Sequence, residues 1–324
     1  AGGLSRDWFD SVARALAQGA SGLGPLATSS DGSLWPRPAP GGFDEAMWMR
    51  CLLAVGRFVA LAVLWERLLP LQLSPVLCKH LLRRRITAGD IRALDPDFAR
   101  HRVDRALEPD GLEETARLLG EPGVAFLSAP TSLQPVAQEL VPGGAVRYVQ
   151  THERDDYVRL LCEARVCGEA RRELTCFLFG FWDLLPLELL EAQRVSPEEL
   201  SVLISGSGCL NPKEWRRHSR CAQGSAGGAE VLAWFWEAVV AELTEEDRVA
   251  LLRFVTGSSI PPPGGFCDLR PPFSVEVSGA GSAEHLPHAH TCANKLVLHR
   301  YASKAQLLEK LLLAVRVSEG FGVV

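Results

Sequence analysis

The chain has nine cysteines but no Cys-x-x-Cys pair. Zinc ribbons and thioredoxin-type redox sites both depend on such pairs, so the sequence favours neither kind of site. The cysteines are odd in number and scattered through apolar patterns, which is typical of small buried side chains in a reducing compartment. We therefore expect a protein of the cytoplasm, with the nucleus as the alternative, that uses no cofactor.

The chain also lacks an uninterrupted apolar segment long enough to cross a bilayer. Its longest apolar run, residues 51–65, contains Gly56 and the charged Arg57. The run is shorter than the roughly 20 residues that a spanning helix needs, and a charge near its middle is costly in a membrane. Residues 1–10 lack the basic, apolar and small-residue order of a secretory signal. The sequence therefore predicts a core helix of a soluble protein.

An excess of basic residues is missing as well. The formal net charge is −5, whereas domains that bind nucleic acid usually carry a strongly basic surface. With 47% hydrophobic and 23% charged residues, the chain can bury a sizeable core and does not have the composition of a disordered protein. Its 324 residues suggest two or three domain-sized units.

Helix signals run through most of the chain. Ser196 followed by Pro197 and Glu199 is a strong helix start. The serine side chain can accept a hydrogen bond from the backbone N–H of the glutamate, and the glutamate side chain can accept one from the N–H of the serine. Ser303 with Gln306 is a second capping box, ahead of a leucine-rich helix. These signals predict a helix from about residue 197 and another near the carboxyl terminus.

Strand signals are concentrated in the last third. Residues 273–277 and 295–299 alternate apolar and polar with a period of two, as strands do, and residues 124–128 suggest an earlier strand. Residues 206–212 contain glycines followed by a proline, which cannot continue the preceding helix. We therefore expect an α+β chain with a domain boundary at 206–212.

The segment 285–301 places Cys292 in a loop just before a predicted strand. A thiol in such a loop is accessible and held by its flanks, which suits a nucleophile that forms and passes on a thioester. His285, His288 and His290 precede it and could form a metal site with the thiol. Zinc ligands must converge tetrahedrally, and no second cysteine pair supports this alternative, so we expect no metal.

This segment resembles the cysteine loop of HECT-type ubiquitin ligases, whose pattern is Leu-Pro-x-x-x-Thr-Cys-x-Asn-x-Leu-x-Leu-Pro-x-Tyr. The matching residues are Leu286, Pro287, Thr291, Cys292, Asn294, Leu296, Leu298 and Tyr301. His299 replaces the second proline of the pattern. Further resemblances follow in family order along the whole chain, at residues 3–8, 53–82, 139–144, 154–158, 177–181, 203–206, 215–218, 234–236, 254–257 and 320–322.

The resemblance implies a bilobal α+β fold. A larger, mostly helical N-lobe would span residues 1–205, with a small subdomain at about 95–165. A smaller α/β C-lobe would span residues 213–324, and residues 206–212 would form the flexible hinge between the lobes. The same resemblance implies a ubiquitin-protein ligase, an acyltransferase that accepts ubiquitin from a conjugating enzyme as a thioester on Cys292 and transfers it to a substrate lysine.

Thioester exchange needs positioning and a modest thiolate fraction more than a strong base, because the bonds broken and made are alike. Thr291 and Asn294 are expected to shape the loop by hydrogen bonds, while His290 either polarises the thiol or is simply solvated. Transfer to a lysine does need a base. Glu284 and Glu319 are both candidates for that carboxylate.

The resemblance also implies roles for three aromatic side chains. Phe321, four places from the end of the chain, would assist transfer to the lysine. Phe98 and Tyr157 would line the hydrophobic groove that binds the conjugating enzyme, where Arg102 replaces a residue that is usually apolar. Residues 104–135 match the family poorly, which leaves the choice of conjugating enzyme open.

Two other functions stay open. A cysteine hydrolase acting on ubiquitin conjugates would need a histidine and a carboxylate aligned with Cys292, and the neighbouring histidines are too close in sequence for a convincing triad. A catalytically degenerate module would bind the conjugating enzyme without forming an adduct. In either case the expected partners are ubiquitin, its conjugating enzyme and protein substrates, rather than nucleic acid or a membrane.

Overall fold

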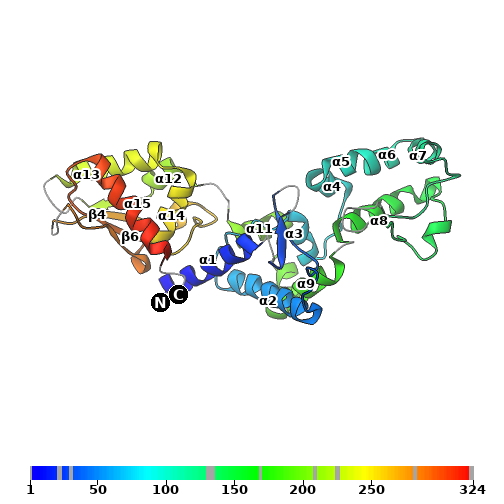
Figure 1. Cartoon of the computed structure of the whole chain (residues 1–324), viewed down its shortest axis with the longest axis horizontal. Coiled ribbons are helices and arrows are strands. Elements are labelled where there is room, and N and C mark those ends of the chain that lie inside the picture. Colours follow the sequence, from blue (N-terminus) through cyan, green and yellow to red (C-terminus); the bar gives the residue numbers. More distant parts are fainter. Residues whose placement is uncertain are drawn as a thin grey trace. The chain divides into compact units, whose positions relative to one another are not determined.

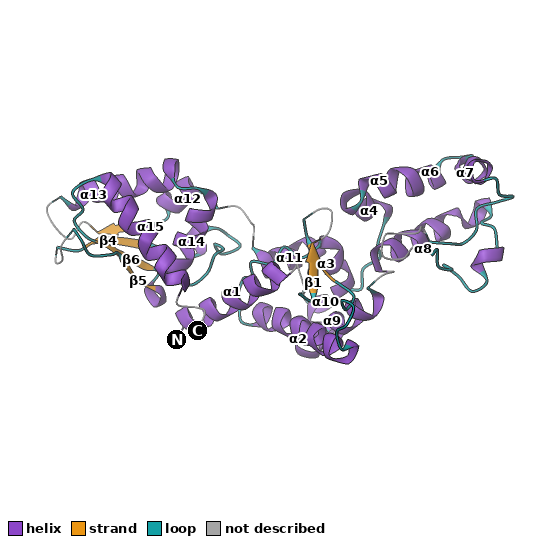
Figure 2. Cartoon of the chain, viewed as in Figure 1, coloured by secondary structure: helices purple, strands orange, loops and turns teal. Residues whose placement is uncertain are grey.

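The structure of the chain is a computed structural model. It describes residues 2–19, 24–28, 32–128, 136–167, 170–206, 210–222, 227–279 and 283–320. The chain forms two compact units. Unit 1 comprises Ala1–Ala15, Ala62–Leu71 and Ser201–Val324, and unit 2 comprises Leu16–Leu61 and Gln72–Leu200. Helix and sheet both occur (Figure 2), which confirms the expected combination of the two.

Unit 2 is mostly helical (Figure 1). Its α-helices are most of α2 (Glu45–Leu64), α3 (Pro75–Leu81), α4 (Ala88–Leu94), α5 (Pro96–Phe98), α6 (Arg105–Leu107), α7 (Gly111–Leu119), α8 (Arg154–Cys167), α9 (Arg171–Leu184) and α10 (Leu187–Ala192). A π-helix, η1 (Ala99–Asp104), and two 3-10 turns, η2 (Gly144–Val146) and η3 (Thr151–Glu153), complete the helical segments. The strands β1 (Leu26–Thr28) and β2 (Leu34–Pro36) pair antiparallel.

Helices α2 and α9 approach each other closely at two glycines. A Cβ atom at Gly56 of α2 would lie 2.1 Å from the backbone oxygen of Phe177, and one at Gly180 of α9 would lie 2.0 Å from the backbone oxygen of Leu53. No side chain fits in either place, so the absence of a Cβ at both positions permits the approach. Phe177 is completely buried, which places this crossing in the core of unit 2.

Among the described residues, α2 is the one helix whose length and composition would allow it to cross a membrane. Two of its charged residues pair with residues of α9. Arg57 pairs with Asp183 of α9, with 2.6 Å between Nη2 and Oδ2, and Glu45 pairs with Arg172. Because the helix packs on α9 and forms ion pairs with it, we interpret α2 as a core helix, which begins earlier than the run at 51–65 suggested.

The segment predicted as a strand at 124–128 forms only isolated bridges. Ala125 pairs with Tyr148, and Leu127 pairs with Glu139. The segment is nevertheless held by backbone hydrogen bonds. The N–H of Phe126 donates to the carbonyls of Gly144 and Arg147, and the N–H of Ser128 donates to the carbonyl of Gln138. Phe126 is buried and packs on Tyr157 of α8, and an apolar run alone does not distinguish such packing from that of a sheet strand.

Unit 1 contains the larger sheet. Its helices are most of α1 (Gly2–Gly19), the end of α2, most of α11 (Pro197–Ser205), α12 (Pro212–Arg217), α13 (Gly228–Glu237), the π-helix η4 (Ala238–Glu242), α14 (Glu245–Thr256) and α15 (Lys304–Gly320). Two 3-10 turns are η5 (Phe266–Asp268) and η6 (Thr291–Ala293). Its strands are β3 (Arg220–Ala222), β4 (Ser274–Val277), β5 (His288–His290) and β6 (Lys295–Leu298).

The four strands of unit 1 form one mixed sheet in the order β3-β4-β6-β5. Strands β3, β4 and β6 are parallel, and β5 is antiparallel to β6. Strands β4 and β6 confirm the predictions for 273–277 and 295–299. Helices α13 and α15 contact each other, and α13 and α14 contact the sheet (Figure 1), so the sheet is covered by helices as in other α/β layers.

The core of unit 1 is built around Trp215, which is completely buried. Its ring stacks on Phe266, with 5.0 Å between centroids and 6° between planes. It meets Phe273 edge-on at 5.0 Å. The core continues through the inward residues of the sheet, Val275 of β4 and Leu296 of β6, so the strands that flank the Cys292 loop rest on a packed interior.

The capping signals are confirmed. The backbone N–H of Glu199 donates to Ser196 Oγ at 3.1 Å, and the N–H of Ser196 donates to the Glu199 carboxylate at 2.9 Å. The N–H of Gln306 donates to Ser303 Oγ at 3.2 Å, at the start of α15. The hinge at 206–212 stays a prediction, since residues 207–209 lie outside the described residues.

Candidate active site

Cys292 lies in η6, a 3-10 turn of three residues that joins β5 to β6. Its side chain is exposed. The two strands on either side of the turn pair with each other in the sheet, so both ends of the turn are fixed while the sulfur stays accessible. An accessible thiol on a fixed turn is the arrangement that a nucleophile requires.

Asn294 is the residue that shapes this turn. Its backbone is left-handed, with φ of 49°, a conformation that asparagine adopts more readily than most residues. It is completely buried, and its Nδ2 donates to the carbonyl of Pro271 at 2.7 Å. Its own carbonyl accepts from the N–H of Ser274 at 2.9 Å. The turn is thereby tied to the start of β4.

Arg6 of α1 completes the hydrogen bonding of the turn. Its Nη1 donates to Asn294 Oδ1 at 3.0 Å, and its Nη2 donates to the carbonyl of Thr291 at 3.1 Å. The guanidinium therefore bonds to residues on both sides of Cys292. No local pattern in the sequence marks Arg6 as part of this site, because more than 280 residues separate it from the turn.

Four histidines lie in or next to β5 and β6. The rings of His288 and His290 are 5.4 Å apart between centroids, and His299 lies 5.8 Å from His288 and 5.5 Å from His285. Burial, then the nearby His290, His299 and Lys295, lower the pKa of His288. Within the described part of the chain, no group of three or more His, Cys, Asp or Glu side chains is arranged to hold a metal ion.

His299 stands where the resemblance has a proline, and it is buried, with 7% of its surface exposed. Next to it, the hydroxyl of Tyr301 donates to the carbonyl of His285 at 3.1 Å. Burial raises the pKa of Tyr301 to about 12, so the hydroxyl keeps its proton and acts as a donor. This bond fixes the segment that leads into β5, and hence the approach to the Cys292 turn.

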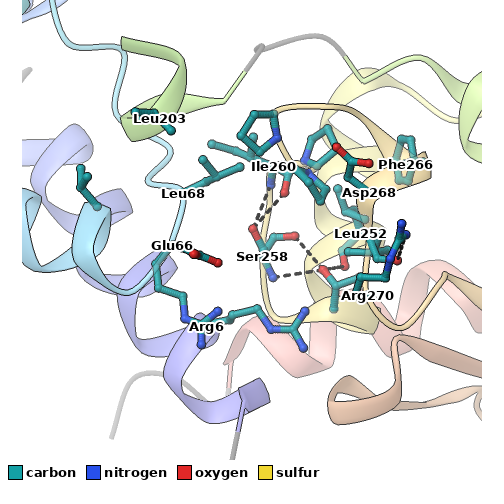
Figure 3. Close-up of a pocket in the computed structure, with 17 residues that line it drawn as sticks. Arg6, Glu66, Leu68, Leu203, Leu252, Ser258, Ile260, Phe266, Asp268 and Arg270 are labelled. Atoms are coloured by element: carbon teal, nitrogen blue, oxygen red, sulfur yellow. Dashed lines mark hydrogen bonds between the residues drawn. The ribbon is translucent and has the colours of Figure 1, made fainter. Parts of the chain in front are cut away.

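A cavity of about 490 Å³ opens beside α1 in unit 1. Figure 3 shows its apolar wall, which includes Leu68, Leu252 and Ile260. Charged side chains at its rim include Arg6 and Asp268. The cavity therefore adjoins the same arginine that bonds to the Cys292 turn.

Of the two carboxylates considered for the second step, Glu284 is described in full. It is exposed and pairs with Lys310 of α15, with 2.9 Å between Nζ and Oε2. The side chain of Glu319 lies outside the described residues, as does Phe321. Their roles stay predictions.

The two aromatic residues expected at the conjugating-enzyme groove lie in unit 2. Tyr157 of α8 is only 4% exposed, and its ring packs edge-on against Phe126 at 5.7 Å. Burial raises the pKa of its hydroxyl. Phe98 at the end of α5 is half-buried, with the guanidinium of Arg165 5.4 Å from its ring centroid. Phe98 is thus the more accessible of the two.

Comparison with known proteins identifies one family. A family model described as HECT-domain (ubiquitin-transferase) matches residues 10–324. The chain is 34% identical to E3 ubiquitin-protein ligase UPL1 of Arabidopsis thaliana, over 99% of this chain and 9% of the relative. It is 29% identical to E3 ubiquitin-protein ligase NEDD4 of Homo sapiens, over 99% of this chain and 24% of the relative.

A third relative is E3 ubiquitin-protein ligase HACE1 of Gallus gallus, which is 29% identical over 97% of this chain and 32% of its own length. The chain therefore spans between about a tenth and a third of the length of these relatives. The matched residues include the Cys292 turn and begin after Arg6.

Proposed function

Because this chain belongs to the HECT-domain (ubiquitin-transferase) family, we propose that it is a ubiquitin-protein ligase that carries ubiquitin as a thioester on Cys292. The observation that supports this most directly is the exposed sulfur on a turn whose flanks are fixed by β5, β6 and Asn294. Buried cysteines such as Cys78 and Cys162 offer no comparable access.

The first step is thioester exchange. The thiolate of Cys292 attacks the carbonyl carbon of the thioester that joins ubiquitin to its conjugating enzyme, and the thiolate of that enzyme leaves. One thioester replaces another, so the step is nearly balanced in energy and its rate depends on how well the sulfur and the carbonyl are positioned. A free thiol provides a few per cent of thiolate near neutral pH, which is sufficient for this step.

The second step makes an amide. The neutral amine of a substrate lysine attacks the new thioester, the Cys292 thiolate leaves, and a base takes the proton from the nitrogen. Glu284 is one candidate for the base, although its pairing with Lys310 means that it must first be released. Glu319 is the other candidate, and Phe321 is proposed to assist this transfer.

The same proposal includes two lobes joined by a hinge at residues 206–212. Cys292 must meet first the conjugating enzyme and then the substrate, so the part of the chain that carries it must change its position. Gly206 has φ of 71°, which an L-residue adopts at a cost, and Gly208 and Pro212 lie in the same segment. Such a segment favours bending over a continuous helix.

Docking of the conjugating enzyme is assigned to the small subdomain at about 95–165. In this subdomain Phe98 is half-buried, and Leu118 and Leu119 of α7 are 68% and 58% exposed. Apolar side chains that remain exposed in this way are a common feature of protein contact surfaces. Tyr157 is buried and packs on Phe126, so its part in docking would require that contact to open.

The test is a charging assay with activating enzyme, conjugating enzyme, ubiquitin and ATP. The chain should form an adduct with ubiquitin that a thiol reductant removes, and Cys292→Ala should abolish it. Matched controls are Cys221→Ala and Cys267→Ala, which remove two other exposed cysteines of unit 1 and should leave the adduct intact. An adduct that survives Cys292→Ala, or cleavage of ubiquitin conjugates without transfer, would refute the assignment.

A further inference from the structure

We propose that Arg6 is a positioning residue of the Cys292 site while α1 and the turn lie in one compact unit, and that α1 is thereby part of the catalytic apparatus; movement about residues 206–212 would break this contact. The inference rests on the proposed function, because it concerns the rate at which Cys292 exchanges its thioester. One guanidinium holds the turn on both sides of Cys292 and so fixes the direction in which the sulfur points.

The geometry is that of a bridge across the turn. Nη1 of Arg6 bonds to the side chain of Asn294 at 3.0 Å, and Nη2 bonds to the carbonyl of Thr291 at 3.1 Å. Within the turn, the N–H of Asn294 donates to the carbonyl of Thr291 at 3.4 Å, which is long for a hydrogen bond. The planar guanidinium presents several N–H groups in a fixed fork, which explains how one side chain serves both acceptors.

Arg6 is held in place by the way α1 is anchored in unit 1. Asp10 of α1 is 1% exposed and accepts a hydrogen bond from the N–H of Ser259 at 2.8 Å. Its carboxylate also pairs with Arg253 of α14, with 3.1 Å between Nε and Oδ2. Arg253 also donates to Ser11 Oγ at 3.0 Å. Helix α14 in turn contacts η6, so one helix supports both Arg6 and the turn.

The electrostatic surroundings agree with this role. Burial, and then the neighbouring Arg67, lower the pKa of Arg6, while the nearby Cys292 acts in the opposite direction. Arginine remains charged in proteins despite such shifts. A charged donor therefore faces Thr291 and Asn294, and bonds from charged donors are stronger than neutral ones.

Loss of the guanidinium would leave Asn294 Oδ1, in a completely buried residue, without this partner. The turn could then shift to find another donor, and the sulfur would move with it. Small misplacements of a reacting group reduce rates strongly, on the order of a hundredfold for about 1 Å. Because Arg6 bonds to the turn, we expect its loss to act on the maximal rate.

The experiment measures the transfer of ubiquitin from the charged conjugating enzyme to the full chain under single-turnover conditions. Arg6→Gln should lower the maximal rate on the order of ten- to a hundredfold and leave the half-saturating concentration of conjugating enzyme unchanged. The maximal rate of Arg6→Lys should lie between those of Arg6→Gln and the wild type, because a single ammonium group cannot reproduce the planar arrangement of guanidinium N–H donors. The matched control is Arg217→Gln, at an exposed arginine of unit 1, which should behave as wild type.

A double-mutant cycle tests whether Arg6 acts through Asn294. Asn294→Gly removes the acceptor while tolerating the left-handed backbone. If the two residues work as a unit, Arg6→Gln combined with Asn294→Gly should be no slower than the slower of the two single variants. Additive losses, or an Arg6→Gln rate equal to or above that of the wild type, would overturn the inference.

Hydrogen exchange of the amides at residues 288–297 separates this inference from the proposed function. Arg6→Gln should exchange faster there than Arg217→Gln, whether or not the chain accepts ubiquitin. If the wild type forms no adduct, the proposed function fails, and the exchange rates still decide whether Arg6 holds the turn. If the adduct forms and both exchange and transfer are unchanged in Arg6→Gln, the inference fails and the proposed function stands.

Discussion

The cysteine sulfur atoms of this chain differ in their surroundings. Cys292 is exposed, whereas Cys162 of α8 is 1% exposed. Burial, followed by the carboxylates of Asp90 and Glu163, raises the pKa of Cys162 to about 11. Since the thiolate is the reactive form, both access and protonation protect Cys162.

This contrast predicts the order of alkylation. At neutral pH, iodoacetamide should modify Cys292 before it modifies Cys162, and peptide mass spectrometry measures both extents over time. The exposed Cys267 serves as a reference for access alone. Modification of Cys162 at the rate of Cys292 would mean that α8 does not bury its sulfur in solution.

At the residue scale, sequence patterns identified Cys292, Thr291 and Asn294 because the three lie within four positions of each other. A local sequence motif can identify residues that lie this close together in the chain. Arg6 could not be found in this way, since its bond to the turn depends on how α1 packs in unit 1. The burial of Tyr157 involves its contact with Phe126, a residue on a different segment of the chain.

At the element scale, the crossing of α2 and α9 gives a stability prediction. Alanine is a better helix former than glycine by about 1 kcal/mol, yet a Cβ at Gly56 would lie 2.1 Å from the backbone oxygen of Phe177. The backbone oxygen of Phe177 can move away only if α9 shifts, so Gly56→Ala should destabilise the protein by about 1–3 kcal/mol. Thermal or urea denaturation measures the change.

The matched control is Gly89→Ala in α4. The nearest atom to a Cβ at Gly89 is Thr87 Oγ1 at 3.6 Å, which is ordinary contact. This substitution should therefore be neutral or slightly stabilising. Equal destabilisation by the two substitutions would show that the approach of α2 to α9 is not as close as described.

Elements with local signals were predictable, and elements defined by distant partners were not. The caps at Ser196 and Ser303 determine where α11 and α15 begin, because the bonds involved span three residues. The short strands β3 and β5 have three residues each and lack enough alternation to be recognised. Residues 124–128 form the apolar run that suggested a strand but find only bridge partners.

At the scale of the whole molecule, family membership and the Cys292 turn agree with a transferase, while movement of the lobes is a proposal. Prolines at Ser207 and Gly208 would restrict the backbone of the proposed hinge, because proline fixes φ. The double variant should slow ubiquitin transfer to Cys292 and then to lysine, with its melting temperature close to that of the wild type. Rapid-quench assays measure both steps, and wild-type rates in the variant would argue against a hinge at 206–212.

The capping and alternation patterns were sufficient to predict helix combined with sheet, and the resemblance was sufficient to predict the family. Neither could predict how the chain divides into compact units, because unit 1 combines residues 1–15, 62–71 and 201–324. Such a division depends on contacts between segments far apart in sequence. Local propensity does not include them.

The most direct measurement of the central claim is ubiquitin charging of Cys292→Ser. A serine at this position should form an oxyester, which resists a thiol reductant but is released by alkali, whereas the wild-type adduct should be released by the reductant. This change in chemical sensitivity would identify the residue-292 side chain as the one that carries ubiquitin. A reductant-sensitive adduct on Cys292→Ser would contradict the account, because the thioester would then be on another cysteine.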